Sequence, residues 1–144
     1  LTKKLAEVLV RLGMKRTLVV WGEGNLDELT TTGTSHIADG SGGKVTCYTV
    51  EPEDVDLGRA SLDDIRGGAT AGEAADQVRA VLRGEAGARL DIVLLNSGAA
   101  LLAAGRASDL KDGVDQARQI INSGAAYRKL EQLVAFAGTA ANYK

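Results

Sequence analysis

Two adjacent carboxylates, Asp27 and Glu28, are the residues of this sequence best suited to chemistry. They follow a short apolar, β-branched run, residues 17–21, and the glycines Gly22 and Gly24. Carboxylate oxygens are preferred ligands of Mg²⁺, and two of them in a loop after a strand can hold the ion beside a phosphate group. A solvated acidic loop without a ligand is the alternative, because Asp and Glu are normally exposed.

The glycines beside this pair are one substitution away from a dinucleotide-binding motif. Asp27 stands where the pattern G-x-G-x-x-G, begun by Gly22 and Gly24, needs its last glycine. No helix signal follows immediately, so the residues favour a turn over a phosphate-binding loop.

A second segment, residues 39–43, has the sequence Asp-Gly-Ser-Gly-Gly and resembles the nucleophile segment of some serine proteases. The single histidine, His36, lies only five residues before Ser41, whereas a catalytic triad needs three groups from separate elements. We therefore interpret the segment as a turn and His36 as a residue on the surface of a strand.

Three further polar features have both a functional and a structural interpretation. Thr30, Thr31 and Thr32 could offer hydroxyls to a ligand or could form an exposed β edge. Asn96 lies in an apolar helical stretch, where its amide must find hydrogen bonds, and we expect it to link the helix to a neighbouring loop. Cys47 alternates with an apolar neighbour on a predicted strand, so we expect a thiol packed in the core.

Composition limits the possible partners. The 144 residues suit one domain, and the net charge is −2 with lysine and arginine spread along the chain, so we expect neither nucleic acid nor a membrane as a partner. Apolar runs such as residues 92–95 are far shorter than a membrane span. One cysteine permits no internal disulfide, and we expect a cytoplasmic protein.

Periodicity and capping residues predict an α/β fold in which helices dominate the second half. The first half of residues 90–104 also fits a buried strand, but its length and alanines favour a helix. We predict a helix over 2–12, a strand over 17–21, a β-hairpin over 34–50, a capped turn at 61–64, helices over 70–84, 90–104, 108–122 (with Ser108 as N-cap) and 125–137, and a tail over 140–144.

Helical spacing also predicts which side chains are buried. The predicted buried faces are Leu1, Leu5, Val8, Leu9 and Leu12 of the first helix, Ala74, Ala75, Val78, Val81 and Leu82 of the second, Leu110, Val114, Ala117 and Ile121 of the fourth, and Leu130, Leu133 and Val134 of the last.

An ordered set of short segments resembles the C-terminal half of the α/β domain of anthranilate phosphoribosyltransferases. The resemblance covers almost the whole chain. The segments are Ala6-Glu7-Val8-Leu9-x-Arg11-Leu12-Gly13, Leu18–Gly22, Leu26-Asp27-Glu28, Thr32-Gly33-Thr34, Arg66-Gly67-Gly68, Arg79-Ala80-Val81-Leu82-x-Gly84-Glu85, Val93-Leu94-Leu95-Asn96-x-x-Ala99-Ala100-Leu101, Gly113-Val114-x-x-Ala117, Ser123–Ala126 and Lys129-Leu130-x-x-Leu133-Val134.

The resemblance implies a fold and a function. The family transfers a phosphoribosyl group from phosphoribosyl pyrophosphate to anthranilate in tryptophan biosynthesis and uses Mg²⁺, which its acidic pair holds against the pyrophosphate. That pair falls on Asp27 and Glu28. The implied fold is part of a phosphoribosyltransferase/nucleoside-phosphorylase-like α/β domain. A pyrimidine-nucleoside phosphorylase shares this fold and is an alternative; a non-catalytic fragment that associates with a partner is another.

The chain also departs from the family pattern. The family's Gly-rich pyrophosphate loop, its Lys-His-Gly-Asn segment, its anthranilate-contacting arginine and its helical domain belong to the N-terminal half. Trp21 stands where histidine is common, and Ala69 where aspartate is expected. The chain begins at Leu1 inside a helical pattern. We therefore expect residues 1–144 to be a partial catalytic domain, with strands mainly within 17–50 and helices within 61–137. Alone it is expected to be inactive, and to bind the missing half or to self-associate.

Overall fold

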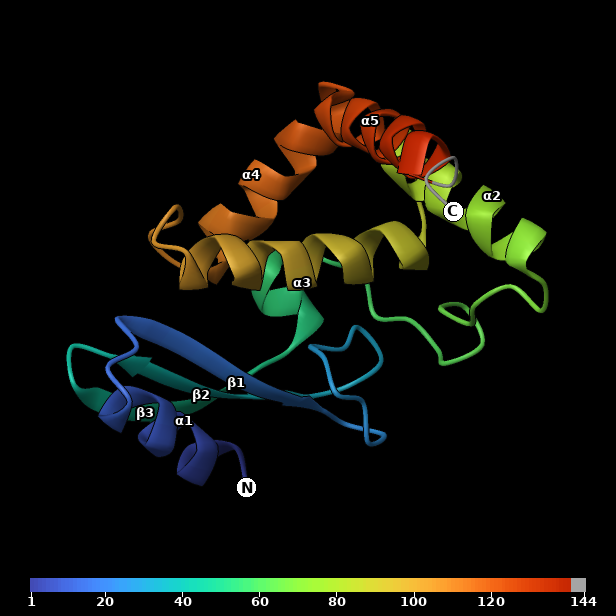
Figure 1. Cartoon of the computed structure of the whole chain (residues 1–144). Coiled ribbons are helices and arrows are strands. Elements are labelled where there is room, and N and C mark those ends of the chain that lie inside the picture. Colours follow the sequence, from blue (N-terminus) through green and yellow to red (C-terminus); the bar gives the residue numbers. More distant parts are fainter. Residues whose placement is uncertain (141–144) are drawn as a thin grey trace.

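The structure is a computed structural model that describes residues 1–140. The α/β fold with a helix-rich second half is confirmed (Figure 1). Its elements are α1 (Thr2–Arg11), β1 (Arg16–Gly22), β2 (Ser35–Ser41), β3 (Lys44–Val50), a 3₁₀ helix η1 (Pro52–Val55), α2 (Ala71–Leu82), α3 (Ala88–Ala103), α4 (Leu110–Asn122) and α5 (Ala125–Ala140).

The described strands form one antiparallel sheet in the order β1-β2-β3. The predicted hairpin is confirmed: Ser41 pairs with Lys44, and the two residues between them, Gly42 and Gly43, have φ of 56° and 78°. Positive φ at both central residues is typical of the tight turns that match the twist of antiparallel strands. The Asp-Gly-Ser-Gly-Gly segment is therefore a strand end and a turn, as we interpreted it.

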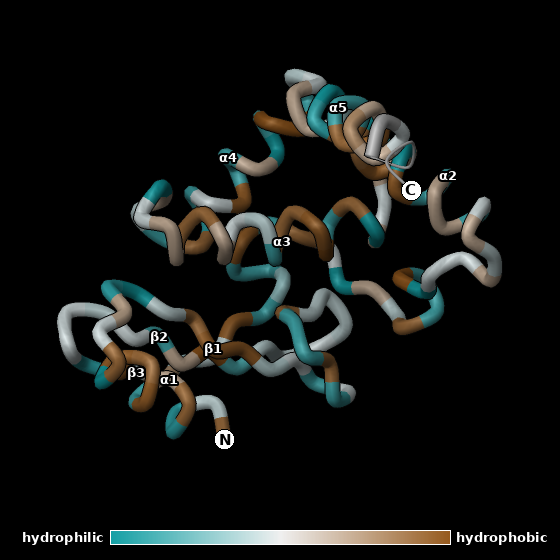
Figure 2. The backbone as a smooth tube through the Cα atoms, viewed as in Figure 1, coloured by the Kyte–Doolittle hydropathy of each residue, from teal (hydrophilic) through white to brown (hydrophobic). Residues whose placement is uncertain are grey.

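The sheet lies between α1 on one face and α3 on the other; α4 begins beside α3 near η1 and leads away from the sheet toward α5 and α2 (Figure 1). Most of the buried apolar residues lie between the sheet and the helices α3 and α4, and the hydrophobic colouring of β1 and α3 follows this layer (Figure 2). Among residues 1–140, no helix has the length and apolar character needed to cross a bilayer.

Helix α1 uses a different face from the predicted one. Ala6 is fully buried, and its carbonyl and the Val10 side chain lie next to Gly40 of β2. Four of the five predicted residues are at least 49% exposed: Leu1, Leu5, Val8 and Leu12. The small residue Ala6 allows close approach to the sheet, and these larger residues stay largely outside the contact.

Helices α3 and α4 cross at two glycines. A Cβ on Gly98 would lie 2.7 Å from the backbone nitrogen of Val114, and a Cβ on Gly113 would meet the carbonyl oxygen of Gly98. The backbones are therefore in direct contact, which only glycine allows. Around this crossing the predicted face of α4 is confirmed as buried by Leu110, Val114, Ala117 and Ile121.

The helix limits mostly agree with the prediction. The predicted helix over 90–104 is α3, which ends at Ala103, and Thr70 caps α2 by accepting a hydrogen bond from the Glu73 N–H. The N-cap of α4 is Asp109 rather than Ser108, because its carboxylate accepts from the Asp112 N–H. Ala140 belongs to α5 and not to the predicted tail, whose residues 141–144 lie outside the described residues.

Outside α1, four further side chains that were predicted to be buried are exposed. Leu133 and Val134 of α5 are 61% and 60% exposed, because α5 contacts α4 and α2 mainly near its first turns, where Ala126 packs on the core and Tyr127 meets Arg83. Val78 of α2 is also exposed. Cys47 is an exposed thiol, because β3 is the outermost described strand.

Replacing Gly98 by alanine should destabilise the protein by about 1–3 kcal/mol, since a backbone atom of α4 occupies the space of the new methyl group. Gly72→Ala is the matched control on the exposed side of α2, where the nearest atom to the new Cβ would be 3.9 Å away. Because alanine has the higher helix propensity, this variant should gain at most about 1 kcal/mol in free energy of unfolding. Urea unfolding of both variants measures the difference. Equal stabilities would contradict the crossing.

Candidate functional site

Residues 23–34 connect β1 to β2 and carry the acidic pair. At the start of this loop Gly22 and Leu26 exchange two backbone hydrogen bonds of 2.9 and 3.1 Å, which close a turn through Gly24 and Asn25, both with positive φ. The interpretation of the glycines as a turn is therefore correct.

Gly22 has a second role that its lack of a side chain permits. A Cβ at this position would lie 2.7 Å from the Glu28 carbonyl oxygen and 3.0 Å from the Thr30 Cβ. The segment after the acidic pair thus folds back directly over the end of β1.

Asn96 of α3 holds the residue that follows the pair. Its Oδ1 accepts from the Leu29 N–H at 2.9 Å, and its Nδ2 donates to the Leu29 carbonyl at 2.8 Å and to the Ile92 carbonyl at 3.0 Å. Leu29 itself is fully buried. The predicted link between helix and loop is confirmed, and it attaches one residue after Glu28.

The threonines are not an exposed β edge. Thr30 and Thr31 are fully buried, the Thr30 N–H donates to Ser35 Oγ at 2.9 Å, and the hydroxyls of Thr30 and Thr32 lie 2.8 Å apart. The Thr30 and Thr32 hydroxyls pair with each other inside the loop and stabilise its shape, whereas the buried Thr31 hydroxyl has no hydrogen-bond partner among the described residues.

The far end of the loop is tied to η1. Thr34 donates its N–H to Glu23 and its hydroxyl to Glu51, at 3.0 and 2.6 Å. Arg59 in turn binds Glu51 and Glu53 at 2.7 and 2.9 Å. The hydrogen bond from Thr34 and the Arg59 guanidinium lower the pKa of Glu51, and Arg59 does the same for Glu53.

Between these anchors Asp27 and Glu28 are both exposed. Partial burial raises the pKa of Glu28, and the neighbouring charge of Asp27 raises it further. Two repelling carboxylates at an accessible loop fit a hard cation as donors. Over the described residues no group of three or more His, Cys, Asp or Glu side chains gathers in a way that could hold a metal ion.

Asp27, the first residue of the acidic pair, borders an apolar groove of ≈ 610 Å³. Asp27 lines it together with Trp21 and His36, whose rings lie 4.9 Å apart, and with Leu5 of the exposed face of α1. His36 is on the surface of a strand, as interpreted. The sequence did not indicate this groove, because its walls come from α1, β1, β2 and the loop.

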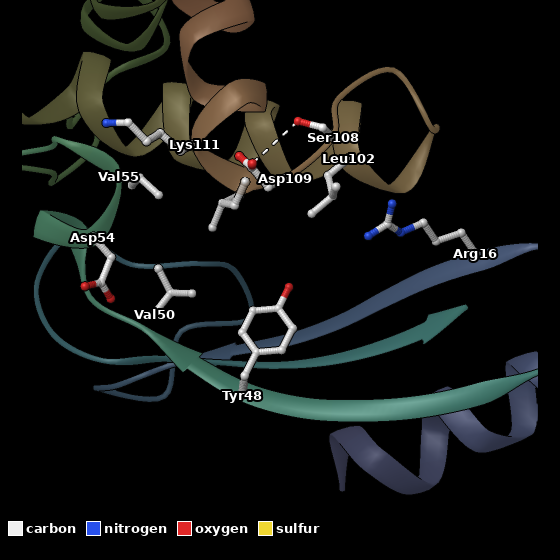
Figure 3. Close-up of a pocket in the computed structure, with 10 residues that line it drawn as sticks. Arg16, Tyr48, Val50, Asp54, Val55, Leu102, Ser108, Asp109 and Lys111 are labelled. Carbon is white, nitrogen blue, oxygen red and sulfur yellow. Dashed lines mark hydrogen bonds between the residues drawn. The ribbon is translucent and has the colours of Figure 1, made fainter. Parts of the chain in front are cut away.

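A second pocket, of ≈ 380 Å³, was also missed (Figure 3). Tyr48 rises from β3 toward Leu102 and Asp109, with Arg16 of β1 at one side (Figure 3). Burial and the Asp39 carboxylate raise the pKa of Tyr48, while Arg16 opposes them, so the hydroxyl stays protonated at neutral pH. Its lining does not include the acidic pair, so it is a site separate from the candidate metal site.

Arg59→Gln should lower the free energy of unfolding at neutral pH but not at acidic pH. The two glutamates have folded pKa values below the ordinary 4.5, so their contribution is present above that pH and is lost as pH falls through the folded values. Urea unfolding from pH 7 to pH 3 should show the difference from the parent shrinking. Arg128→Gln, which loses only a bond to the Ser123 carbonyl, is the control and should show no such trend.

Several known proteins that are similar to this chain in sequence or in structure carry the same name. Anthranilate phosphoribosyltransferases of Desulfotalea psychrophila and Azorhizobium caulinodans are 66% and 50% identical to this chain over 136 and 129 residues, which are 94% and 90% of the chain but 39% and 37% of those proteins. The crystal structure of the Thermus thermophilus enzyme matches with a TM-score of 0.81 and 43% identity, over 92% of this chain and 38% of that one.

A more distant structure, a Saccharomyces cerevisiae anthranilate phosphoribosyltransferase variant with Mg bound, matches with a TM-score of 0.70 and 25% identity, over 81% of this chain and 34% of that one. The fold is thus that of the phosphoribosyltransferase/nucleoside-phosphorylase-like α/β domain. The chain spans less than two fifths of the length of the curated relatives named here. Residues 1–127 match the family described as "Glycosyl transferase family, a/b domain", and the chain belongs to that family.

Proposed function

We propose that residues 1–144 are a partial catalytic domain of an anthranilate phosphoribosyltransferase, which transfers phosphoribosyl from phosphoribosyl pyrophosphate to anthranilate in tryptophan biosynthesis. The 66% identity to the Desulfotalea psychrophila enzyme is the observation that carries this proposal. It also favours this activity over that of a pyrimidine-nucleoside phosphorylase.

Asp27 and Glu28 are the proposed Mg²⁺ ligands. Their exposure, adjacency and mutual repulsion support this role. The Mg bound in the structure of the yeast relative supports it as well. When bound, the ion would neutralise negative charge on a departing pyrophosphate. The chain's own contribution is to present two carboxylates from a loop whose flanking residues are fixed by Gly22 and Asn96.

The chain supplies only part of the proposed site. Glycine-rich phosphate contacts and the anthranilate contacts expected from the family resemblance would come from sequence outside residues 1–144. We therefore propose that the 144-residue chain alone is inactive and that it needs this remainder as a partner. A cytoplasmic location agrees with its single free thiol.

The function can be tested by mixing this chain with a second polypeptide, the part of the Desulfotalea psychrophila enzyme that this chain does not match. Anthranilate fluorescence should fall with phosphoribosyl pyrophosphate and Mg²⁺ present, and neither part should be active alone. Asp27→Asn with Glu28→Gln should lower the activity of the mixture by about 100-fold or more, since charge stabilisation of a leaving group has this size. Glu131→Gln on exposed α5 is the control. A complex that forms but stays inactive would support a non-catalytic fragment.

The exposed face of α1 should make the isolated chain self-associate, because contiguous apolar surface favours association. Sedimentation velocity should show concentration-dependent species larger than a monomer. Leu5→Glu with Val8→Glu should shift the chain toward the monomer. Gln119→Glu with Asn122→Glu, which adds the same charge on exposed positions of α4, should not. A monomer at all concentrations contradicts the expectation.

A further inference from the structure

The side-chain amide of Asn96 pairs with Leu29 as a neighbouring strand would. It accepts from the N–H and donates to the carbonyl of the same residue, at 2.9 and 2.8 Å. The second Nδ2 hydrogen is used by the Ile92 carbonyl of the same helix, at 3.0 Å. These three bonds fix both the position of the amide and which of its ends faces each partner.

The anchor has a reason to hold at both ends. Leu29 is fully buried, so losing its hydrogen bonds would leave an N–H and a carbonyl without partners away from water. The carrier helix α3 is locked against α4 by the contact between Gly98 and Gly113, two residues beyond Asn96 and on the neighbouring helix. The amide therefore ties the loop to a helix whose backbone is in direct contact with α4.

Asp27 and Glu28 occupy a short bridge between two fixed points. Leu26 is held by its two bonds with Gly22, and Leu29 is held by Asn96. Only the two acidic residues lie between them. The directions of both carboxylates therefore depend on the two anchors, and the second anchor is a single side chain.

We propose that Asn96 is a positioning residue for metal binding, which presets the Asp27–Glu28 backbone so that both carboxylates can reach one divalent cation. This rests on the proposed metal role of the acidic pair. Residues that orient metal ligands typically change metal affinity by about 10–100-fold when they are removed. The action here passes through the backbone, so we expect a loss of roughly 10-fold, the low end of that range.

Mn²⁺ is a suitable probe, because its unpaired electrons broaden the amide signals of nearby residues even when binding is weak. Titration of the isotope-labelled 144-residue chain should broaden the signals of residues 26–29 first. In Asn96→Leu, which keeps the shape but loses every hydrogen bond, the apparent Mn²⁺ affinity should fall roughly 10-fold. Asn122→Leu, the same change at the exposed end of α4, should leave the affinity unchanged.

A purely structural role for Asn96 predicts a lower melting temperature with the same Mn²⁺ affinity, measured where the variant is still folded. That result would overturn the proposal. If Asn96→Leu does not fold, Asn96→Asp decides, because it keeps the acceptor for the Leu29 N–H and loses the donor to the Leu29 carbonyl. Its added negative charge favours cation binding, so a weaker Mn²⁺ affinity supports lost positioning, and a tighter affinity, which the added charge alone predicts, contradicts the proposal. No broadening in the parent chain would reject the metal role of Asp27 and Glu28, and this inference with it.

Discussion

A buried backbone must find partners for its N–H and carbonyl groups, and at Leu29 a single amide side chain from a distant helix meets this requirement. The hydrogen bonds of Asn96 join the sheet half of the chain to the helical half at the point where the loop enters the core. Without them the loop after β1 would have to expose Leu29 to water. The position of the candidate site therefore follows from a rule about buried polar groups.

The sheet gives the site a different setting from that of an open parallel sheet. In an open parallel sheet, ligands collect at the carboxyl ends of the strands. The described strands are antiparallel, so β2 starts where β1 ends and the acidic loop connects neighbouring strands. The loop is shaped by Gly22, by the threonine hydrogen bonds and by Asn96, and not by adjacent strand ends.

Local signals in the sequence predicted the elements well and their surroundings poorly. The face of α4 was correct and those of α1 and α5 were largely wrong, although all three show helical spacing. Periodicity identifies which residues share a face but not what covers it, and α1 packs through Ala6 instead. Similarly, Asn96 stood out as a polar residue in an apolar helix, but its partner lies 67 positions away and no local pattern points to it. The metal role of Asp27 and Glu28 came from a loop after a strand and from a family resemblance, and it stays a prediction.

The glycine crossing of α3 and α4 has a consequence for the order in which the chain folds. It joins residues only 15 positions apart, whereas the bonds of Asn96 close a segment more than four times as long. Short segments lose less chain entropy on closing, so the helical hairpin should form early and the loop with the acidic pair should be ordered late. The part of the molecule proposed to do chemistry is then the last to be built, upon a helical platform that is already complete.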